Sequence, residues 1–303
     1  MSRELDVLQE KITSQIAAER QREMAEAIAA NRADAQRAEA RMAREAKSLA
    51  AMGIDLANLE ALDREMSGEA ATELLELEAR LDGQSQLLPG NGLSPDIEMG
   101  LLPEGAHVLT PAWTAAYSDQ DLQAANTQAT DLAAQTLIGG GACKNYYNWA
   151  KGAGSGLAGT GVGKIQSWVE FGFWFKPGVS RFYSVRPLFR FRGYVIVKAD
   201  DGFFTSKAAR VTGSVWTNVH QYNWKGWNST NVYDDGGDNI NVNTRRDIDR
   251  TTYNSYLLGG GDWAFIRCVI GLWAYARGSG SYAKNDFATG NANFLCVPHV
   301  YVV

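Results

Sequence analysis

Hydrophobic and polar residues follow one pattern up to about residue 82 and a different one after residue 166. In the first segment, apolar residues recur every three or four positions among strong helix formers, chiefly Ala, Glu, Arg, Leu and Met. In the second, runs such as WVEFGFWF (168–175) and PLFRFRGYVIVKA (187–199) are apolar at every second position, which is typical of strands. The patterns predict an α+β chain in separate segments: a long helical arm, then an antiparallel β-sandwich or jelly-roll-like head.

The helical arm carries a heptad seam. Two interleaved rows of apolar or small residues repeat every seven positions and identify candidate oligomerisation residues: Ile28, Asn31, Ala35, Ala38, Met42, Leu49, Met52, Leu56 and Leu59. Because every Phe, Trp and Tyr lies at or after Trp113, the arm has little with which to build its own core. We therefore expect a coiled coil of several copies; a single solvated helix held by Glu–Arg pairs is the alternative.

An earlier apolar stripe (Leu5, Leu8, Ile12 and Ile16) is out of phase with this seam, and a stutter near residues 16–24 would join the two.

Glycine and proline divide the rest of the chain. Residues 1–82 form the arm, with a break near Gly53 and a later helix from an N-cap at Ser67 to a stop at Gly83. Residues 83–112 carry prolines and glycines and are predicted to be a linker. The aromatic-rich domain, 113–303, is expected to contain a helix at about 118–137 and the sandwich at about 166–303.

Composition and charge exclude several classes of protein. A net charge of −5 and a pI near 5.4 give no basic field for nucleic acid. The first residues lack a secretory signal, and no apolar run is long enough to span a membrane, so we expect synthesis in the cytoplasm and assembly into a virion or other extracellular particle. Cys143, Cys268 and Cys296 are too few and scattered to predict a disulfide framework or a metal site.

The glycine-rich stretch GSGLAGTGVGKIQSW (154–168) resembles a phosphate-binding loop but departs from it at both ends. Ala158 stands where the first glycine is needed, and Ile165 replaces the Ser or Thr that would bind magnesium. A strand, not a helix, is predicted to follow. We therefore expect no nucleotide cofactor and interpret the stretch as a compact turn.

Two clusters in the head are candidates for binding. Tyr222, Trp224, Trp227 and Asn228 combine aromatic rings with polar donors, which suits sugar rings or a protein interface, although packing in the core is the alternative. Asp234, Asp235 and Asp238 offer oxygen ligands for calcium, but their spacing fits no EF-hand loop and turn chemistry is favoured. The three histidines show no zinc spacing.

The predicted layout is an oligomeric rod followed by a hinge and an aromatic-rich β head. In this layout the chain resembles the fibres, whiskers and head spikes of tailed bacteriophages and related particles. The resemblance implies a homotrimer without cofactor or catalytic activity, one end held by other particle proteins and a head that binds a cell-surface glycan or packs into the particle. A secreted lectin-like or pore-forming protein and a β-sandwich hydrolase remain alternatives. The oligomer number and the end that anchors stay open.

Overall fold

The structure is a computed structural model that describes residues 3–87, 105–119, 141–152, 162–199, 207–226, 228–278, 280–289 and 292–303. Its helices are α1 (Arg3–Ala51) and α2 (Leu56–Leu87). The strands of the described chain are β1 (His107–Leu109), β2 (Trp113–Ser118), β3 (Cys143–Lys144), β4 (Tyr146–Lys151), β5 (Val162–Phe175), β6 (Arg181–Ala199), β7 (Ala208–Gln221), β8 (Asn223–Trp224), β9 (Thr230–Gly237), β10 (Ile240–Thr251), β11 (Asn254–Leu258), β12 (Ala264–Arg277), β13 (Tyr282–Phe287), β14 (Phe294–Cys296) and β15 (Val300–Val302).

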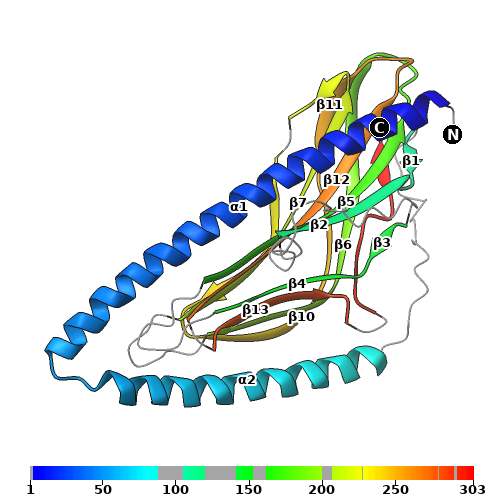
Figure 1. Cartoon of the computed structure of the whole chain (residues 1–303). Helices are drawn as coiled ribbons and strands as arrows, with labels where there is room; N and C mark the ends of the chain where they lie inside the picture. The colour runs from blue at the N-terminus through cyan, green and yellow to red at the C-terminus, as the bar shows by residue number, and fades with distance from the viewer. Residues whose placement is uncertain are drawn as a thin grey trace.

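The strands form two antiparallel sheets that pack face to face (Figure 1). The nine-stranded sheet is built around β6, which pairs with β10, β11, β13, β14 and β15 along its length. The six-stranded sheet has the order β2-β5-β12-β7-β8, with β9 also paired to β7. The predicted combination of an N-terminal helical segment and an antiparallel β-sandwich is confirmed, whereas the predicted coiled coil is not shown by this single chain.

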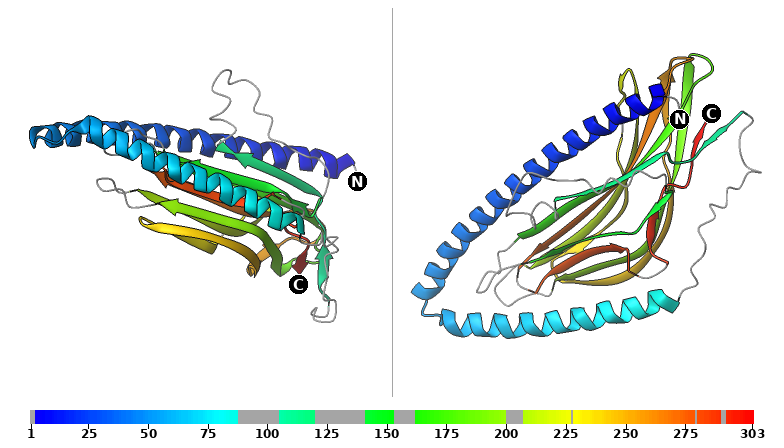
Figure 2. Two further views of the ribbon diagram at one scale, coloured as in Figure 1. Left: turned by 90° about the horizontal axis from the view of Figure 1, so that it is seen from below. Right: turned by 45° about the vertical axis from the view of Figure 1, so that its right-hand side comes forward.

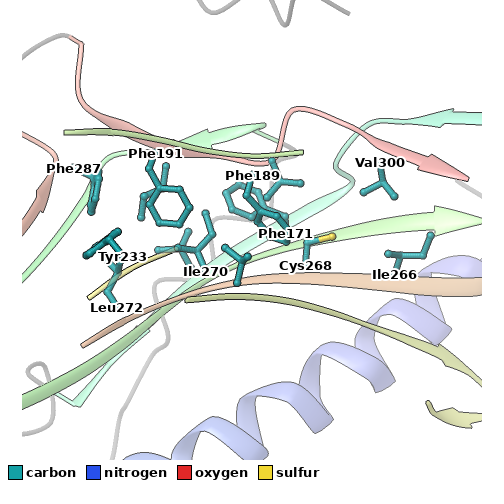
Figure 3. Packing of buried hydrophobic residues seen from close by; sticks show 14 of the residues in the cluster. Phe171, Phe189, Phe191, Tyr233, Ile266, Cys268, Ile270, Leu272, Phe287 and Val300 are labelled. Carbon is teal, nitrogen blue, oxygen red and sulfur yellow. The ribbon is translucent and has the colours of Figure 1, made fainter. Parts of the chain in front are cut away.

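The core between the sheets follows from the alternation seen in the sequence. Inward-facing side chains of β5, β6 and β12, such as Phe171, Phe189 and Ile270, are fully buried and interdigitate (Figure 3). β12 lies between β5 and β7 and is apolar on both faces because helix α1 covers its other side. Helix α1 is thus a third layer of the structure, and a second layer of buried side chains lies between it and the six-stranded sheet.

Helix α1 packs against the outer face of the six-stranded sheet, which corrects the expectation that the arm buries its stripe only against other copies. The side chains of Ile12 and Ile16 are fully buried, and Leu5 and Met24 nearly so. Ile12, Ile16 and Met24 contact a layer of aromatic side chains on the sheet. This layer consists of Trp113 (β2), Trp168 (β5), Trp216 (β7) and Phe265 (β12). The apolar stripe near the start of the helix therefore packs against aromatic residues more than 90 positions away in the sequence. Periodicity along the chain cannot predict such a contact.

The two helices form a hairpin that turns at Gly53. Gly53 has φ +78°, a left-handed conformation that a glycine adopts at little cost. Asp55 then caps α2, because its Oδ1 accepts hydrogen bonds from the backbone N–H groups of Ala57 and Asn58 at 3.0 and 3.2 Å.

Helix α2 does not end where the sequence analysis placed its boundaries. It runs through Ser67, Gly68 and Gly83 to Leu87, so the predicted cap and stop are wrong. A single glycine costs a helix only about 1 kcal/mol relative to alanine, and the surrounding helix formers outweigh that cost.

The hairpin straddles the sandwich (Figures 1 and 2). α1 lies on the six-stranded sheet, while Leu77 of α2 packs against Tyr194, Ile196 and Tyr282 on the outer face of the nine-stranded sheet. Lys198 of β6 also pairs with Glu73 of α2. The end of the hairpin, around Ala51–Leu56, extends beyond the sandwich (Figure 1).

Several other predicted boundaries are corrected. Strand β1 lies inside the expected 83–112 linker and pairs with β15, and β2 and β4 add to the sheets well before residue 166. Ser118, the expected cap of a helix at 118–137, is instead the last residue of β2, and residues 120–140 lie outside the described part of the chain. Short strands are set by long-range partners, so their own residues carry little signal.

Cys143 and Cys296 form a disulfide across 153 residues, linking β3 to β14, where they are direct partners. The number and spacing of the cysteines predicted no disulfide framework, and this bond corrects that interpretation. Two cysteines this far apart give no spacing pattern, and only the sheet register brings them together. Cys268 is buried and free, and burial raises the pKa of its thiol.

Candidate functional site

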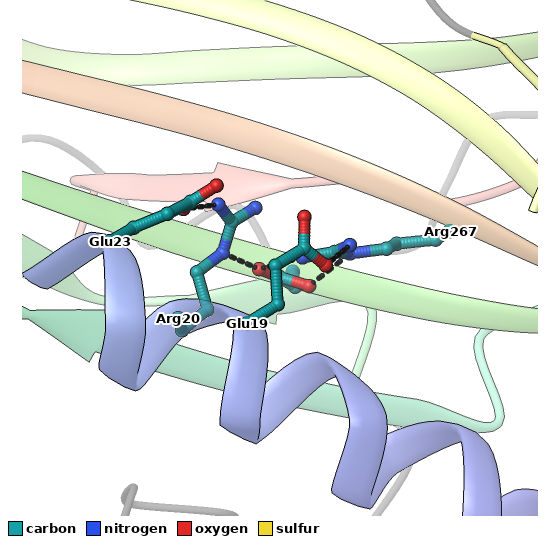
Figure 4. Close-up of polar contacts among 5 residues, drawn as sticks. Glu19, Arg20, Glu23 and Arg267 are labelled. Atoms are coloured by element: carbon teal, nitrogen blue, oxygen red, sulfur yellow. Dashed lines mark hydrogen bonds and ion pairs between the residues drawn. The ribbon is translucent and has the colours of Figure 1, made fainter.

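A cluster of buried charges holds α1 on the sheet (Figure 4). Glu170 of β5 is fully buried, and its carboxylate accepts hydrogen bonds from Arg267 of β12 and Arg20 of α1, with closest N–O distances of 2.6 Å each. Arg267 Nη1 also reaches Glu19 at 2.8 Å, and Arg20 pairs with Glu23. Every charge in this cluster has an opposite partner, as buried ions require.

The arginines decide the ionisation of Glu170. Burial alone would raise its pKa, but the charges and hydrogen bonds of Arg267 and Arg20 outweigh burial and hold the pKa below its ordinary value. Arg20 also lies over the rings of Trp168 and Trp216, 4.7 and 5.7 Å from their centroids. These rings are therefore covered by a side chain of α1 and are not free to stack on a ligand.

Beside this cluster, a groove of about 450 Å³ runs between α1 and the sheet. Its lining includes Glu23 and Glu26 of α1, Asp119 and Lys164. The groove reaches Asn31, whose Nδ2 donates to the Lys164 carbonyl oxygen at 2.8 Å. Lys164, from the glycine-rich stretch, thus lies in strand β5 and contacts the helix; residues 154–161 of that stretch lie outside the described chain.

The predicted oligomerisation residues fall into three groups. Ile28 is half-buried, and Asn31 contacts the sheet instead of another copy in this single chain. The side chains of Ala35, Ala38 and Met42 lie outside the described part. Around the hairpin turn, Leu49, Leu56 and Leu59 are half-buried and Met52 is 68% exposed. Self-association through them stays a prediction.

Three turns meet at one end of the sandwich, and we call residues 177–182, 221–224 and 257–262 the turn end. The Gly261 N–H donates to the Pro177 carbonyl at 2.8 Å, and the Gly260 N–H donates to Ser180 Oγ at 2.8 Å. Buried Gln221 clamps the third turn: its Nε2 donates to the carbonyls of Gly259 and Asp262, and its Oε1 accepts from the Gly259 N–H. The turns are thus fixed to one another by hydrogen bonds.

The turn end displays large hydrophobic side chains to solvent. Phe182 and Leu257 are direct cross-strand partners and are 67% and 55% exposed. Val179 is 61% exposed and Tyr222 is 73% exposed. Exposed apolar groups gathered on a rigid support are typical of an interaction surface.

The aromatic residues predicted to bind a ligand separate in the structure. Tyr222 joins β7 to β8 with φ 67°, an unusual conformation for a residue other than glycine, and its hydroxyl donates to Asp262. Trp224 is half-buried and packs inward against His220 and under Arg267, so it supports the helix-binding face. Asn228 is exposed, and Trp227 lies outside the described residues. Of these predicted residues that the structure describes, Tyr222 alone belongs to the turn end as an exposed ring.

The predicted aspartate cluster is divided between two ion pairs. Asp234 binds Arg210, and Asp235, on the opposite face of β9, binds Arg246. Asp238 is exposed in the turn before β10. Among the described residues no group of three or more His, Cys, Asp or Glu is placed to hold a metal ion.

Sequence reasoning missed the buried charge cluster. A signal was present: Glu170 is the single charge in residues 168–175 and Arg267 the single charge in residues 265–276, and each lies on the face opposite the sandwich core. Isolated charges at such positions require a partner. The sequence does not show that Glu170 and Arg267 lie next to each other on neighbouring strands, or that helix α1 supplies the remaining charges. Both facts follow only from the fold.

Comparison with known proteins identifies no family. Neither a protein-family model nor a curated protein matches the chain. Solved structures with some similarity include TmCBM61 in complex with beta-1,4-galactotriose (10% identity, 66% of this chain, 88% of that chain, TM-score 0.18). Another is the enzymatically active domain of bacteriophage CBA120 tailspike protein 4 (8% identity, 49% of this chain, 19% of that chain, TM-score 0.14). Likenesses this weak carry no argument about function.

Neither helix, over its described residues, contains an apolar stretch long enough to cross a bilayer.

Proposed function

We propose that the chain is a structural attachment protein, an oligomeric fibre or spike component of a phage-like particle. In this proposal the helical hairpin joins copies of the chain, as a trimer, and connects them to other particle proteins. The β head, through its turn end, contacts a cell-surface glycan or another surface component. No catalytic step is assigned.

The observation that carries this proposal is the separation of two exposed apolar surfaces. The end of the hairpin, with Met52 and Leu62 exposed at 68% and 49%, lies at one extreme of the molecule. The turn end lies at the other extreme, beyond the top of β11 (Figure 1). A chain with one surface at each end can assemble through one and attach through the other without competition between them.

Binding of the full chain to cells or insoluble polysaccharides tests the turn end. Tyr222→Gly removes the exposed ring while relieving the left-handed backbone, so folding should be kept. We expect bound protein to fall at least fivefold for Tyr222→Gly and for Phe182→Ser. Tyr147→Gly, which removes a 51% exposed tyrosine from strand β4, should bind normally. Wild-type protein that adheres to no surface would reject the attachment role.

A further inference from the structure

A second surface lies beside the turn end, on the outer face of the nine-stranded sheet. Tyr183 and Val185 of β6 point into the core, so Ser184 and Arg186 lie on the opposite, outer face. Arg186 pairs directly with Tyr301 of β15 on one side, and its guanidinium lies 5.3 Å from the ring of Tyr253 on the other. We call Ser184, Arg186, Tyr253, Ser255 and Tyr301 the Tyr–Arg strip.

The arginine of the strip is held in place but is not neutralised. Its Nε donates to Ser184 Oγ at 3.0 Å, and Ser184 lies opposite Ser255 in the register of β6 and β11. Among the described residues no carboxylate pairs with Arg186, whereas most arginines on the sheets have an acidic partner. Tyr253 is 69% exposed. The strip therefore presents one oriented cation between two aromatic rings.

The charges nearby reinforce a preference for an anion. Arg190 and Arg192, further along the same face of β6, share the single carboxylate of Asp249 at 3.3 and 2.6 Å. This face is locally positive on a chain whose net charge is −5.

We propose that the Tyr–Arg strip binds a saccharide that carries a carboxylate, with the carboxylate on Arg186 and the apolar face of a sugar ring on Tyr253. A guanidinium binds carboxylates through paired N–H groups. Serine and tyrosine hydroxyls supply both donors and acceptors for sugar hydroxyls. A polyphosphate such as nucleic acid draws its affinity from roughly 6–10 phosphate contacts, more than the few cations of this face can make. The inference rests on the proposed attachment role and names the chemistry of what is attached.

Affinity electrophoresis of the full chain in gels containing polygalacturonate tests the strip, with dextran as the neutral saccharide and polyglutamate as the acidic non-saccharide. We expect retardation by polygalacturonate alone. Arg186→Ala and Tyr253→Ala should each weaken it at least tenfold, and Arg186→Lys should be intermediate because lysine keeps the charge but loses the planar fork. Arg37→Ala, which removes an exposed arginine from α1, is the matched control and should bind as wild type.

Three results would overturn the inference: equal retardation by dextran, equal retardation by polyglutamate, or full binding by Arg186→Ala. Adhesion to cells that survives in Arg186→Ala but is lost in Tyr222→Gly would reject the strip and leave the attachment role intact. Absence of adhesion in the wild type would reject the attachment role itself.

Discussion

At the scale of single residues, a buried carboxylate connects the helix to the sheet. Glu170 neutralises Arg20 from the helix and Arg267 from the sheet, and so ties together segments 150 and 97 residues apart. Removing one partner of a buried ion pair lowers the free energy of unfolding, because the remaining charges stay buried without an opposite charge.

Glu170→Gln should therefore destabilise the fold by about 3–5 kcal/mol in urea unfolding. The matched control is Glu23→Gln, whose side chain is 37% exposed and which should cost about 1 kcal/mol or less. Equal effects of the two substitutions would show that the cluster does not fix the helix.

The same residue predicts a dependence on pH. The pKa of Glu170 is lower in the folded chain than the ordinary value of about 4.3 for an unfolded glutamate, so its contribution to stability is present above about pH 4.3. That contribution disappears as the pH falls through the folded-state pKa. Unfolding measured between pH 3 and 7 should show an acid-dependent loss in the wild type that is smaller in Glu170→Gln.

At the scale of elements, helix α1 is a third layer of the sandwich over its first half and a free arm over its second. The first half buries Ile12 and Ile16 on an aromatic sheet face. The second half leaves the sandwich and turns back at Gly53. One helix thus combines a packing role and an extending role.

Ile12→Ala and Ile16→Ala should each lower the free energy of unfolding by about 2–4 kcal/mol, because a fully buried side chain leaves a cavity. Val7→Ala lies on the same helix but is 62% exposed, so it should change stability by about 0.5 kcal/mol or less. If all three variants melt alike, the helix is not docked on the sheet.

The Cys143–Cys296 disulfide joins two short strands at the edge of the nine-stranded sheet. Its reduction should lower stability by about 2–4 kcal/mol, mainly because the unfolded chain regains conformational freedom. Melting with and without a reductant measures this effect, and Cys143→Ser with Cys296→Ser should melt like the reduced protein and no longer respond to the reductant.

At the scale of the whole molecule, the hairpin end and the turn end form two separate exposed surfaces. If the hairpin end joins copies of the chain, Met52→Asp combined with Leu62→Asp should shift the sedimentation coefficient toward that of a monomer. Val179→Asp places the same charge on a 61% exposed residue of the turn end and should leave the assembly unchanged. A wild-type chain that sediments as a monomer at micromolar concentration would contradict assembly through the hairpin.

Removing residues 1–104 should not yield a smaller soluble assembly. Without α1, the ring faces of Trp168 and Trp216 and the side chain of Phe265 would be exposed on one sheet, and Arg267 would lose its ion pair with Glu19. We expect this truncated chain to aggregate, as measured by light scattering, while the full chain stays dispersed.

Local patterns in the sequence specify the class of each segment. Helix formers without aromatics dictated α1 and α2, and alternating apolar residues dictated long strands such as β5, β6 and β12, because both patterns are local and repeat many times. The partners of these elements follow from the three-dimensional fold: Ile12 and Ile16 face tryptophans, Glu170 joins Arg20 to Arg267, Cys143 bonds to Cys296, and Arg186 lies between Tyr253 and Tyr301. Each of these depends on the register of strands far apart in the chain, and register is set by the packing of the whole sandwich.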